Sequence, residues 1–255
     1  MSDPITIALD DDKIISAFHG QPREDAVLKR KQTLVLMMHG FPGDKSSHNN
    51  IYGELEFILN HKGFHTLRFD FYGCGKSSGS EEDFSLNRAR VTLDIVKEWA
   101  ESSGYKRLIF ISEGLGCAVA LMNMEINLAC QVMLWPALDA QHVAKTLFGA
   151  DNISLEAKQN GYVSLGDHKA GLGFISELSK TNLKPLFQDT TMPVLIMHGV
   201  DDNLYPVEQL DLARQYMTSK RIEIMTFQDG AHGLPALNHR KSMFFHITQF
   251  IEKYA

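Results

Sequence analysis

Cysteine is scarce in this sequence: 255 residues include only Cys74, Cys117 and Cys130. Their number is odd, and their spacing fits neither a disulfide framework nor a zinc-binding motif. These counts exclude a small disulfide-stapled scaffold and a zinc-finger module, and we interpret the three residues as unrelated thiols. We expect neither a cofactor nor a bound metal.

Long apolar runs and an excess of positive charge are also missing. No segment approaches the roughly 18–20 consecutive apolar residues that span a bilayer, and the start Met1-Ser2-Asp3-Pro4 lacks the regions of a secretion signal. We therefore expect a cytoplasmic protein without a membrane partner. Lys and Arg number 25 against 31 Asp and Glu, which gives a formal net charge of −6. Because duplex binding needs a basic face, we expect no nucleic-acid partner, and we interpret the one basic run, residues 29–31, as a loop.

Apolar strand-like runs alternate with helical patterns along most of the chain. The predicted strands are residues 33–38, 64–69, 107–111, 132–135, 193–198 and 222–227. The predicted helices are residues 51–61, 86–102, 115–124, 207–218 and 239–254. This alternation is typical of βαβ units, so it predicts an α/β fold with a parallel sheet and helices on both faces.

Two segments depart from the alternation. Residues 5–9 and 13–18 predict an antiparallel hairpin around Asp10-Asp11-Asp12, which we interpret as a solvated turn, with a metal site as the alternative. Residues 136–190 are too long for a structureless loop, and we expect an inserted cap over the carboxyl edge of the sheet. Phe148, Tyr162 and Phe174 in this cap would form either an aromatic pocket or core. Residues 1–255 are thus predicted to be a single domain.

Three loops that follow predicted strands carry unusual residue combinations. The first is the glycine-rich His39-Gly40-Phe41-Pro42-Gly43, whose backbone N–H groups could face a ligand. The second, His198-Gly199-Val200-Asp201-Asp202, places a carboxylate just beyond a strand. The third, Gly230-Ala231-His232-Gly233, places a histidine between glycines. An acid followed by a histidine after late strands is typical of the last two members of a hydrolase triad.

That chain order requires a nucleophile at the turn after a central strand, within the pattern G-x-S-x-G. The corresponding segment is Ser112-Glu113-Gly114-Leu115-Gly116, in which Gly114 occupies the nucleophile position. A residue with a side chain is strained there by about 1–3 kcal/mol, and glycine removes most of this strain. The sequence therefore predicts an easily folded turn without an attacking atom.

Together with the loop Asp70-Phe71-Tyr72-Gly73-Cys74-Gly75-Lys76-Ser77, these motifs make the chain resemble the α/β-hydrolases of the small-capped esterase type, similar to feruloyl and cinnamoyl esterases. The resemblance covers nearly the whole chain. It implies an α/β-hydrolase fold with a twisted, mostly parallel sheet of about eight strands. It also implies that Asp202 orients His232, that His232 is the general base, and that the N–H groups of Phe41 and Leu115 form the oxyanion hole.

Other residues at these positions remain as alternatives. Candidates for a substitute nucleophile are Ser112, Cys117, Ser77 and Ser78, each of which is otherwise interpreted as a structural residue. Glu113 is either a hydrogen-bonded support behind the turn or a proton-transfer group. Asp201 is the alternative to Asp202, while His39 and His198 are expected to be buried supports of their loops.

The resemblance implies a carboxylic-ester hydrolase scaffold that takes a small-molecule ester between Phe41, Leu115, His232 and the cap. Phe41, Glu113 and Leu115 are the expected substrate-binding residues, and the protein is expected to be a monomer or homodimer. Loss of a serine nucleophile lowers kcat by about 10⁶, so the chain is expected to be impaired. One alternative is a non-catalytic protein that binds a small ligand or partner. A further alternative is lyase- or oxygenase-type chemistry by His232 and Asp202. Gly114 is either natural or introduced, and the sequence leaves both open.

Overall fold

The computed structural model describes residues 2–10, 12–24, 26, 30, 32–124 and 128–255. Met1, Asp11 of the predicted acidic turn, and Lys29 and Lys31 of the basic run lie outside the described residues. Within the described part of the chain, no helix combines the length and apolar character needed to cross a membrane.

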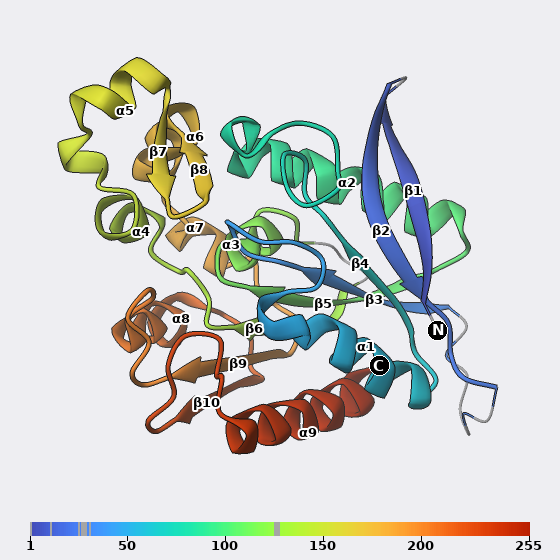
Figure 1. Cartoon of the computed structure of the whole chain (residues 1–255). Coiled ribbons are helices and arrows are strands. Elements are labelled where there is room, and N and C mark those ends of the chain that lie inside the picture. Colours follow the sequence, from blue (N-terminus) through green and yellow to red (C-terminus); the bar gives the residue numbers. More distant parts are fainter. Residues whose placement is uncertain (1, 11, 25, 27–29, 31, 125–127) are drawn as a thin grey trace.

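An eight-stranded sheet forms the centre of the fold (Figure 1). The strands lie in the order β1-β2-β4-β3-β5-β6-β9-β10. Pairings from β4 to β10 are parallel, while β1–β2 and β2–β4 are antiparallel. Their bounds are β1 Ser2–Asp10, β2 Lys13–Gly20, β3 Thr33–Met38, β4 His65–Phe69, β5 Arg107–Glu113, β6 Leu128–Leu134, β9 Val194–Gly199 and β10 Ile222–Phe227. The predicted hairpin and the mostly parallel sheet are confirmed.

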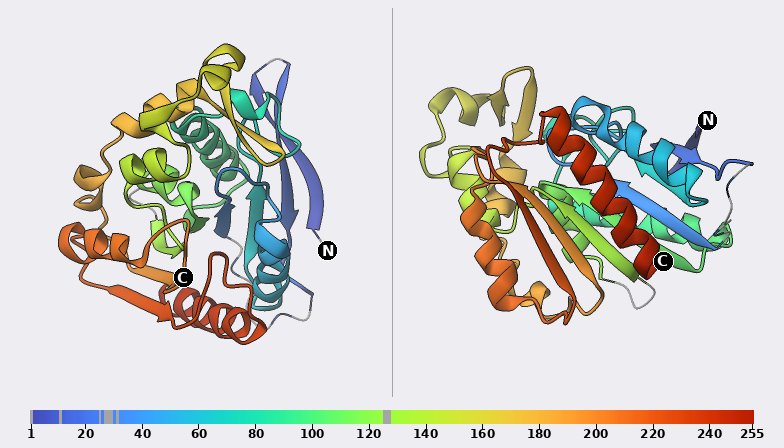
Figure 2. Two further views of the ribbon diagram at one scale, coloured as in Figure 1. Left: turned by 60° about the vertical axis from the view of Figure 1, so that its left-hand side comes forward. Right: turned by 90° about the horizontal axis from the view of Figure 1, so that it is seen from below.

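Helices cover both faces of this sheet (Figure 2). On one face α1 (Ile51–His61) and α9 (Leu237–Tyr254) pack together, and on the other α2 (Leu86–Ser102) contacts α3 (Leu115–Leu121). The bounds predicted for α1 and α2 agree with the structure. For α2, Ser85 Oγ accepts a hydrogen bond from Arg88 N, which satisfies a free N–H group at the start of the helix.

Two predicted helices are shorter than expected. The helix predicted for 115–124 ends at Leu121, and Asn123 Nδ2 then donates to Val119 O, which satisfies a carbonyl group at the helix end. The helix predicted for 207–218 divides into a 3₁₀ turn, η4 (Val207–Gln209), and α8 (Leu210–Tyr216). Two further 3₁₀ turns lie in loops outside residues 136–190: η1 (His48–Asn50) after β3 and η2 (Glu81–Asp83) before α2.

Residues 136–190, which we call the cap segment, lie between β6 and β9 in the chain. They form α4 (Ala140–Thr146), η3 (Ala150–Asn152), α5 (Leu155–Asn160), β7 (Tyr162–Leu165), β8 (His168–Gly171), α6 (Leu172–Lys180) and α7 (Lys184–Phe187). β7 and β8 form a separate antiparallel pair. Figure 1 shows these elements at the upper left, on the far side of the molecule from the hairpin of β1 and β2.

Aromatic packing and charged contacts attach the cap segment to the rest of the chain. Phe41 stacks on Phe84 with ring centroids 4.4 Å apart, and Phe174 packs against Phe41 at 5.1 Å. Glu177 of α6 accepts hydrogen bonds from the first two N–H groups of α2. Phe148 and Phe174 are both buried in this cluster, so they are core residues in the structure.

Candidate active site

The turn between β5 and α3 is built around two glycines. Gly114 has φ +51° and ψ −122°, a backbone conformation that residues with side chains rarely adopt. Gly116 lies where a Cβ atom would run into the backbone carbonyl oxygens of Met38 and His39. Glycine at 116 therefore lets α3 approach the end of β3, which brings the loop after β3 next to Gly114.

Asp202 and His232 form a hydrogen-bonded pair, although they follow different strands. Asp202 lies after β9 and His232 after β10, and His232 Nδ1 donates to Asp202 Oδ2 over 2.9 Å. The other carboxylate oxygen, Oδ1, accepts from the N–H groups of Leu204 and Tyr205, both at 2.9 Å. The carboxylate is thus fixed on both sides, and it binds one of the two imidazole nitrogens of His232, whose side chain is partly exposed.

The surroundings of Asp202 determine its charge. Burial by itself would raise the pKa of Asp202, but the hydrogen bond and charge of His232 and the two backbone N–H groups lower it. The net result is a pKa below the ordinary value, so Asp202 is ionised at neutral pH. An ionised carboxylate that holds Nδ1–H fixes the imidazole tautomer in which Nε2 is a proton acceptor.

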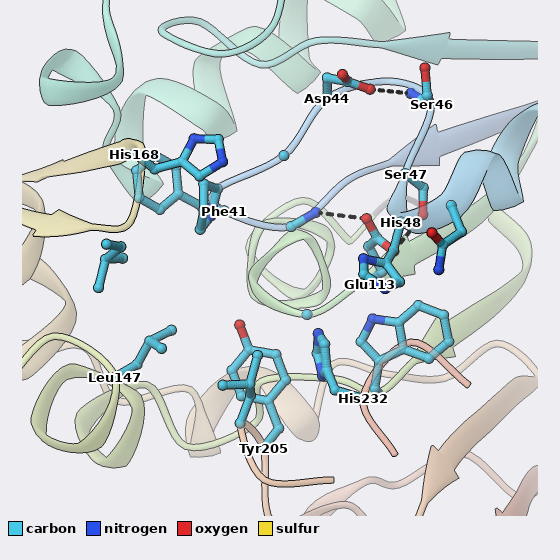
Figure 3. A pocket seen from close by; sticks show the side chains of 18 of the residues that line it. Phe41, Asp44, Ser46, Ser47, His48, Glu113, Leu147, His168, Tyr205 and His232 are labelled. Atoms are coloured by element: carbon cyan, nitrogen blue, oxygen red, sulfur yellow. Dashed lines mark hydrogen bonds between the residues drawn. The ribbon is translucent and has the colours of Figure 1, made fainter. Parts of the chain in front are cut away.

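Two aromatic rings flank His232. Trp135 and Tyr205 both meet the imidazole edge-to-face, with centroids 5.9 Å and 5.3 Å away. Figure 3 shows His232 beside Tyr205, on the wall of the pocket opposite Phe41 and His168. The side chain of His232 is 27% exposed, so its ring is both held in place and accessible.

A pocket of about 740 Å³ opens in front of this pair. Its volume lies within the range usual for small-molecule sites. Gly114, His232 and the loop after β3 line it on one side, and Leu147, Leu165 and His168 of the cap segment also line it. His168 Nδ1 binds Glu81 Oε1 over 2.7 Å, so one contact between the cap segment and η2 lies at the wall of this pocket.

Glu113 holds the loop after β3 in place. Its Oε1 accepts from Gly40 N at 3.3 Å, and its Oε2 accepts from the Ser47 hydroxyl at 2.7 Å. Burial raises the pKa of Glu113, although both hydrogen bonds act in the opposite direction. Because Phe41 directly follows Gly40, these contacts also position the Phe41 N–H.

The predicted site residues are not all equally accessible. Phe41, Glu113, Gly114 and His232 line the pocket, and Asp202 lies behind His232. The side chain of Leu115 is fully buried and lies outside the described lining of this pocket. The predicted contact of Leu115 with a ligand therefore depends on its backbone N–H rather than on its side chain.

The buried histidines of the glycine-rich loops have structural contacts. His39 donates from Nδ1 to Gly40 O at 2.6 Å and accepts from Phe71 N at Nε2 over 3.0 Å. Burial lowers the pKa of His39, which matches its use as a neutral donor and acceptor. His198 donates from Nε2 to Tyr205 O at 2.7 Å. Both histidines support the backbone of a site loop.

The alternative nucleophiles have structural contacts as well. Ser112 is fully buried and donates to Cys117 Sγ, and burial raises the pKa of the Cys117 thiol to about 12. Ser77 donates to Asp70 O and accepts from Ser16 N, and Ser78 Oγ accepts from Ile14 N. Asp201 is exposed, whereas Asp202 binds His232.

Several pocket residues were not identified from the sequence. Tyr205, Trp135, Ser47 and His48 line the pocket. No local pattern distinguishes Trp135, Ser47 and His48, whereas Tyr205 could have been considered because it lies three residues after Asp202 in the same loop. Among the described residues, no group of three His, Cys, Asp or Glu side chains is placed to hold a metal ion.

Comparison with known proteins gives the family. A family model described as acyl transferase matches residues 3–160, which is more than half of the chain. The chain belongs to the acyl transferase family. An acyl transferase from Shewanella hanedai is 30% identical over 152 residues, covering 59% of this chain and 47% of that protein. The chain spans about half the length of this and of a second curated acyl transferase that it matches.

Solved structures give the fold. Est1E from Butyrivibrio proteoclasticus with ferulic acid bound superposes with a TM-score of 0.83 at 22% identity, covering 98% of each chain. The mouse alpha/beta hydrolase domain-containing protein 10 superposes with a TM-score of 0.76 at 14% identity, covering 99% of this chain and 100% of that one. The predicted α/β-hydrolase fold is confirmed.

Proposed function

We propose that this member of the acyl transferase family acts on a small, uncharged carboxylic ester that binds beside His232. The observation that carries the proposal is the Asp202–His232 pair, whose His232 lines a pocket of about 740 Å³. A histidine fixed by an ionised carboxylate is a general base for acyl chemistry. The N–H groups of Phe41 and Leu115 are the proposed donors to the oxyanion.

The glycine at position 114 sets the proposed reaction type. No hydroxyl is present there to form an acyl-enzyme, so water or an alcohol attacks the ester carbonyl directly while His232 takes its proton. Such a reaction is slow compared with that of a serine enzyme, because the oxyanion hole and binding alone leave about 10³–10⁴ of rate acceleration. The proposal is therefore an impaired ester hydrolase.

The charge of the pocket supports an uncharged substrate. Asp44, Glu81 and Glu113 contribute carboxylates to its lining, while no Lys or Arg occurs among the described lining residues. A second negative charge within a few ångströms of a partly buried carboxylate costs on the order of several kcal/mol. A free carboxylate or phosphate on the ligand is therefore disfavoured.

Ester hydrolysis by matched variants tests this function. The unchanged chain, Gly114→Ser, Gly114→Ala and His232→Ala are assayed with p-nitrophenyl acetate, methyl ferulate and the anionic p-nitrophenyl hydrogen succinate. We expect slow turnover that requires His232, with the anionic ester the poorest of the p-nitrophenyl pair. Gly114→Ser should raise turnover by about 100-fold or more and add an acyl-enzyme burst. Gly114→Ala, which adds a side chain without an attacking oxygen, should not.

Two results would contradict the proposal. If His232→Ala hydrolyses these esters as fast as the unchanged chain, the base is not His232. If neither the chain nor Gly114→Ser turns over any ester but the chain still binds methyl ferulate, a ligand-binding protein is the better explanation. Turnover of a ligand without hydrolysis, dependent on His232, would instead favour lyase- or oxygenase-type chemistry.

A further inference from the structure

The hydroxyl of Tyr205 lies next to the backbone of the residue at the nucleophile position. A Cβ atom added to Gly114 would be 3.3 Å from Tyr205 Oη. Tyr205 is 3% exposed, and it lines the same pocket as Gly114 and His232. In Figure 3 the hydroxyl end of Tyr205 points into the pocket, alongside the His232 ring. The hydroxyl oxygen of Tyr205 therefore lies in the space that a side chain at position 114 would need.

Tyr205 and His232 are fixed by the same carboxylate. Asp202 Oδ1 accepts from Tyr205 N at 2.9 Å, while Asp202 Oδ2 accepts from His232 Nδ1 at 2.9 Å. The carbonyl of Tyr205 accepts from His198 Nε2 at 2.7 Å. Because Asp202 binds both the backbone of Tyr205 and the imidazole of His232, the loop segment that carries Tyr205 is held beside His232.

The Tyr205 hydroxyl keeps its proton under ordinary conditions. Burial raises the pKa of Tyr205, and the negative charge of Asp202 adds to this effect. The group is therefore not an anionic nucleophile. A neutral phenol both donates and accepts a hydrogen bond, so it suits the binding of a water molecule.

We propose that the Tyr205 hydroxyl is a further catalytic group, which binds the water molecule that His232 activates. This inference rests on the ester hydrolysis proposed above. The water gives one proton to His232 Nε2, and its oxygen forms a bond to the ester carbonyl carbon. The bond between that carbon and the alcohol oxygen then breaks, and His232 returns the proton to the alcohol. Tyr205 loses no proton and contributes only its hydrogen bond.

The substitution Tyr205→Phe removes the oxygen and retains the ring. We expect kcat for p-nitrophenyl acetate to fall about tenfold with KM changed less than twofold, as for loss of one hydrogen bond in the transition state. With methanol added, the ratio of methyl ester to free acid should be higher for Tyr205→Phe than for the unchanged chain. The reason is that attack by water loses the hydrogen bond from Tyr205, on which attack by methanol depends less. Tyr216→Phe, the same change outside the pocket, is the control and should alter neither quantity.

The outcomes separate this inference from the proposed function. If hydrolysis requires His232 but Tyr205→Phe leaves both kcat and the methanol ratio unchanged, the role of Tyr205 is refuted and the function stands. If hydrolysis is absent or does not require His232, both are refuted. Thermal unfolding checks that Tyr205→Phe is folded. Tyr205→Gln, which restores a polar side chain, should recover part of the lost kcat, and no recovery would count against the inference.

Discussion

Gly114 and Tyr205 occupy complementary space: a Cβ atom added to Gly114 would lie 3.1 Å from Tyr205 Cε2. This distance is shorter than ordinary van der Waals contact between carbon atoms. A side chain at 114 therefore requires the buried ring of Tyr205 to move, in addition to adopting the backbone conformation of Gly114. The two residues should be energetically coupled.

We expect Gly114→Ser to lower the free energy of unfolding by about 1–3 kcal/mol, because φ at this position is +51°. In the background of Tyr205→Val, the same change should cost less, because the ring is absent. Urea unfolding of the four proteins in this double-mutant cycle measures the coupling. Strictly additive effects would show that the ring does not restrict residue 114.

Asp202→Asn should reduce ester hydrolysis by about 10²–10⁴-fold, because the amide no longer fixes the imidazole tautomer. The substitution also removes a pH-dependent contribution to stability. The folded pKa of Asp202 lies below its ordinary value of 3.8, so this contribution is present above pH 3.8 and is lost as the pH falls through the folded pKa. The stability difference between the chain and Asp202→Asn, measured by urea unfolding from pH 6 to 3, should therefore shrink. A difference that grows toward acid pH would refute the ionised state.

Stability should also fall in weak acid because of a chain of hydrogen bonds among residues outside the described lining of the pocket. Gln21 Nε2 donates to His19 Nδ1, His19 Nε2 donates to the Tyr105 hydroxyl at 2.7 Å, and that hydroxyl donates to His65 Nδ1 at 2.9 Å. This direction of donation requires both imidazoles to be neutral. Burial, followed by the charge of His19, lowers the pKa of His65 to about 4.

The sign of the pH dependence follows from this lowered pKa. The unfolded chain binds a proton at His65 near pH 6.5, whereas the folded chain does not until about pH 4. The contribution of neutral His65 is thus present above pH 6.5 and is lost as the pH falls toward 4. His65→Asn should flatten this part of the stability profile in urea unfolding, whereas His61→Asn, at an exposed helical position, should leave it unchanged. An equal slope in His65→Asn would exclude His65 as its source.

The buried ion pair of Lys45 and Asp70 should be important for stability. The Lys45 ammonium binds Asp70 Oδ2, and Oδ1 of the same carboxylate accepts from Lys45 N at 2.7 Å. The side chain of Asp70 is fully buried, so Lys45→Met would leave an uncompensated charge. We expect a loss of about 3–5 kcal/mol in urea unfolding.

The exposed pair of Lys13 and Asp10 supplies the matched control. Its side chains are 46% and 50% exposed, and Lys13→Met should therefore cost no more than about 1 kcal/mol. In the double variant Lys45→Met/Asp70→Asn, part of the loss should be recovered, because no charge is left buried. Similar costs at both pairs would mean that Asp70 does not carry a charge in the folded protein.

Individual strands and helices were predictable from the sequence, because apolar runs and helix-capping residues lie within or next to the segment that they specify. The apolar run at residues 33–38 corresponds to β3, whose six residues are all buried. The helix at residues 86–102 has the predicted bounds of α2, since Ser85 caps its start and Gly104 follows its end with φ +89°. The loops after the strands also predicted that Asp202 and His232 lie together, as their hydrogen bond shows, because parallel strands bring their carboxyl ends to one edge of the sheet.

Contacts between distant segments could be decided only by the tertiary structure. Three sets of contacts join residues that are 66 to 91 positions apart in the chain. They are Tyr205 with Gly114, Glu113 with Gly40 and Ser47, and His168 with Glu81. No periodicity or turn motif encodes such pairs, because they depend on how whole elements pack. The sequence by itself thus determined most strands and helices of the central sheet layer and the glycine at the turn after β5. Packing of the loops around that glycine decided which side chains surround it.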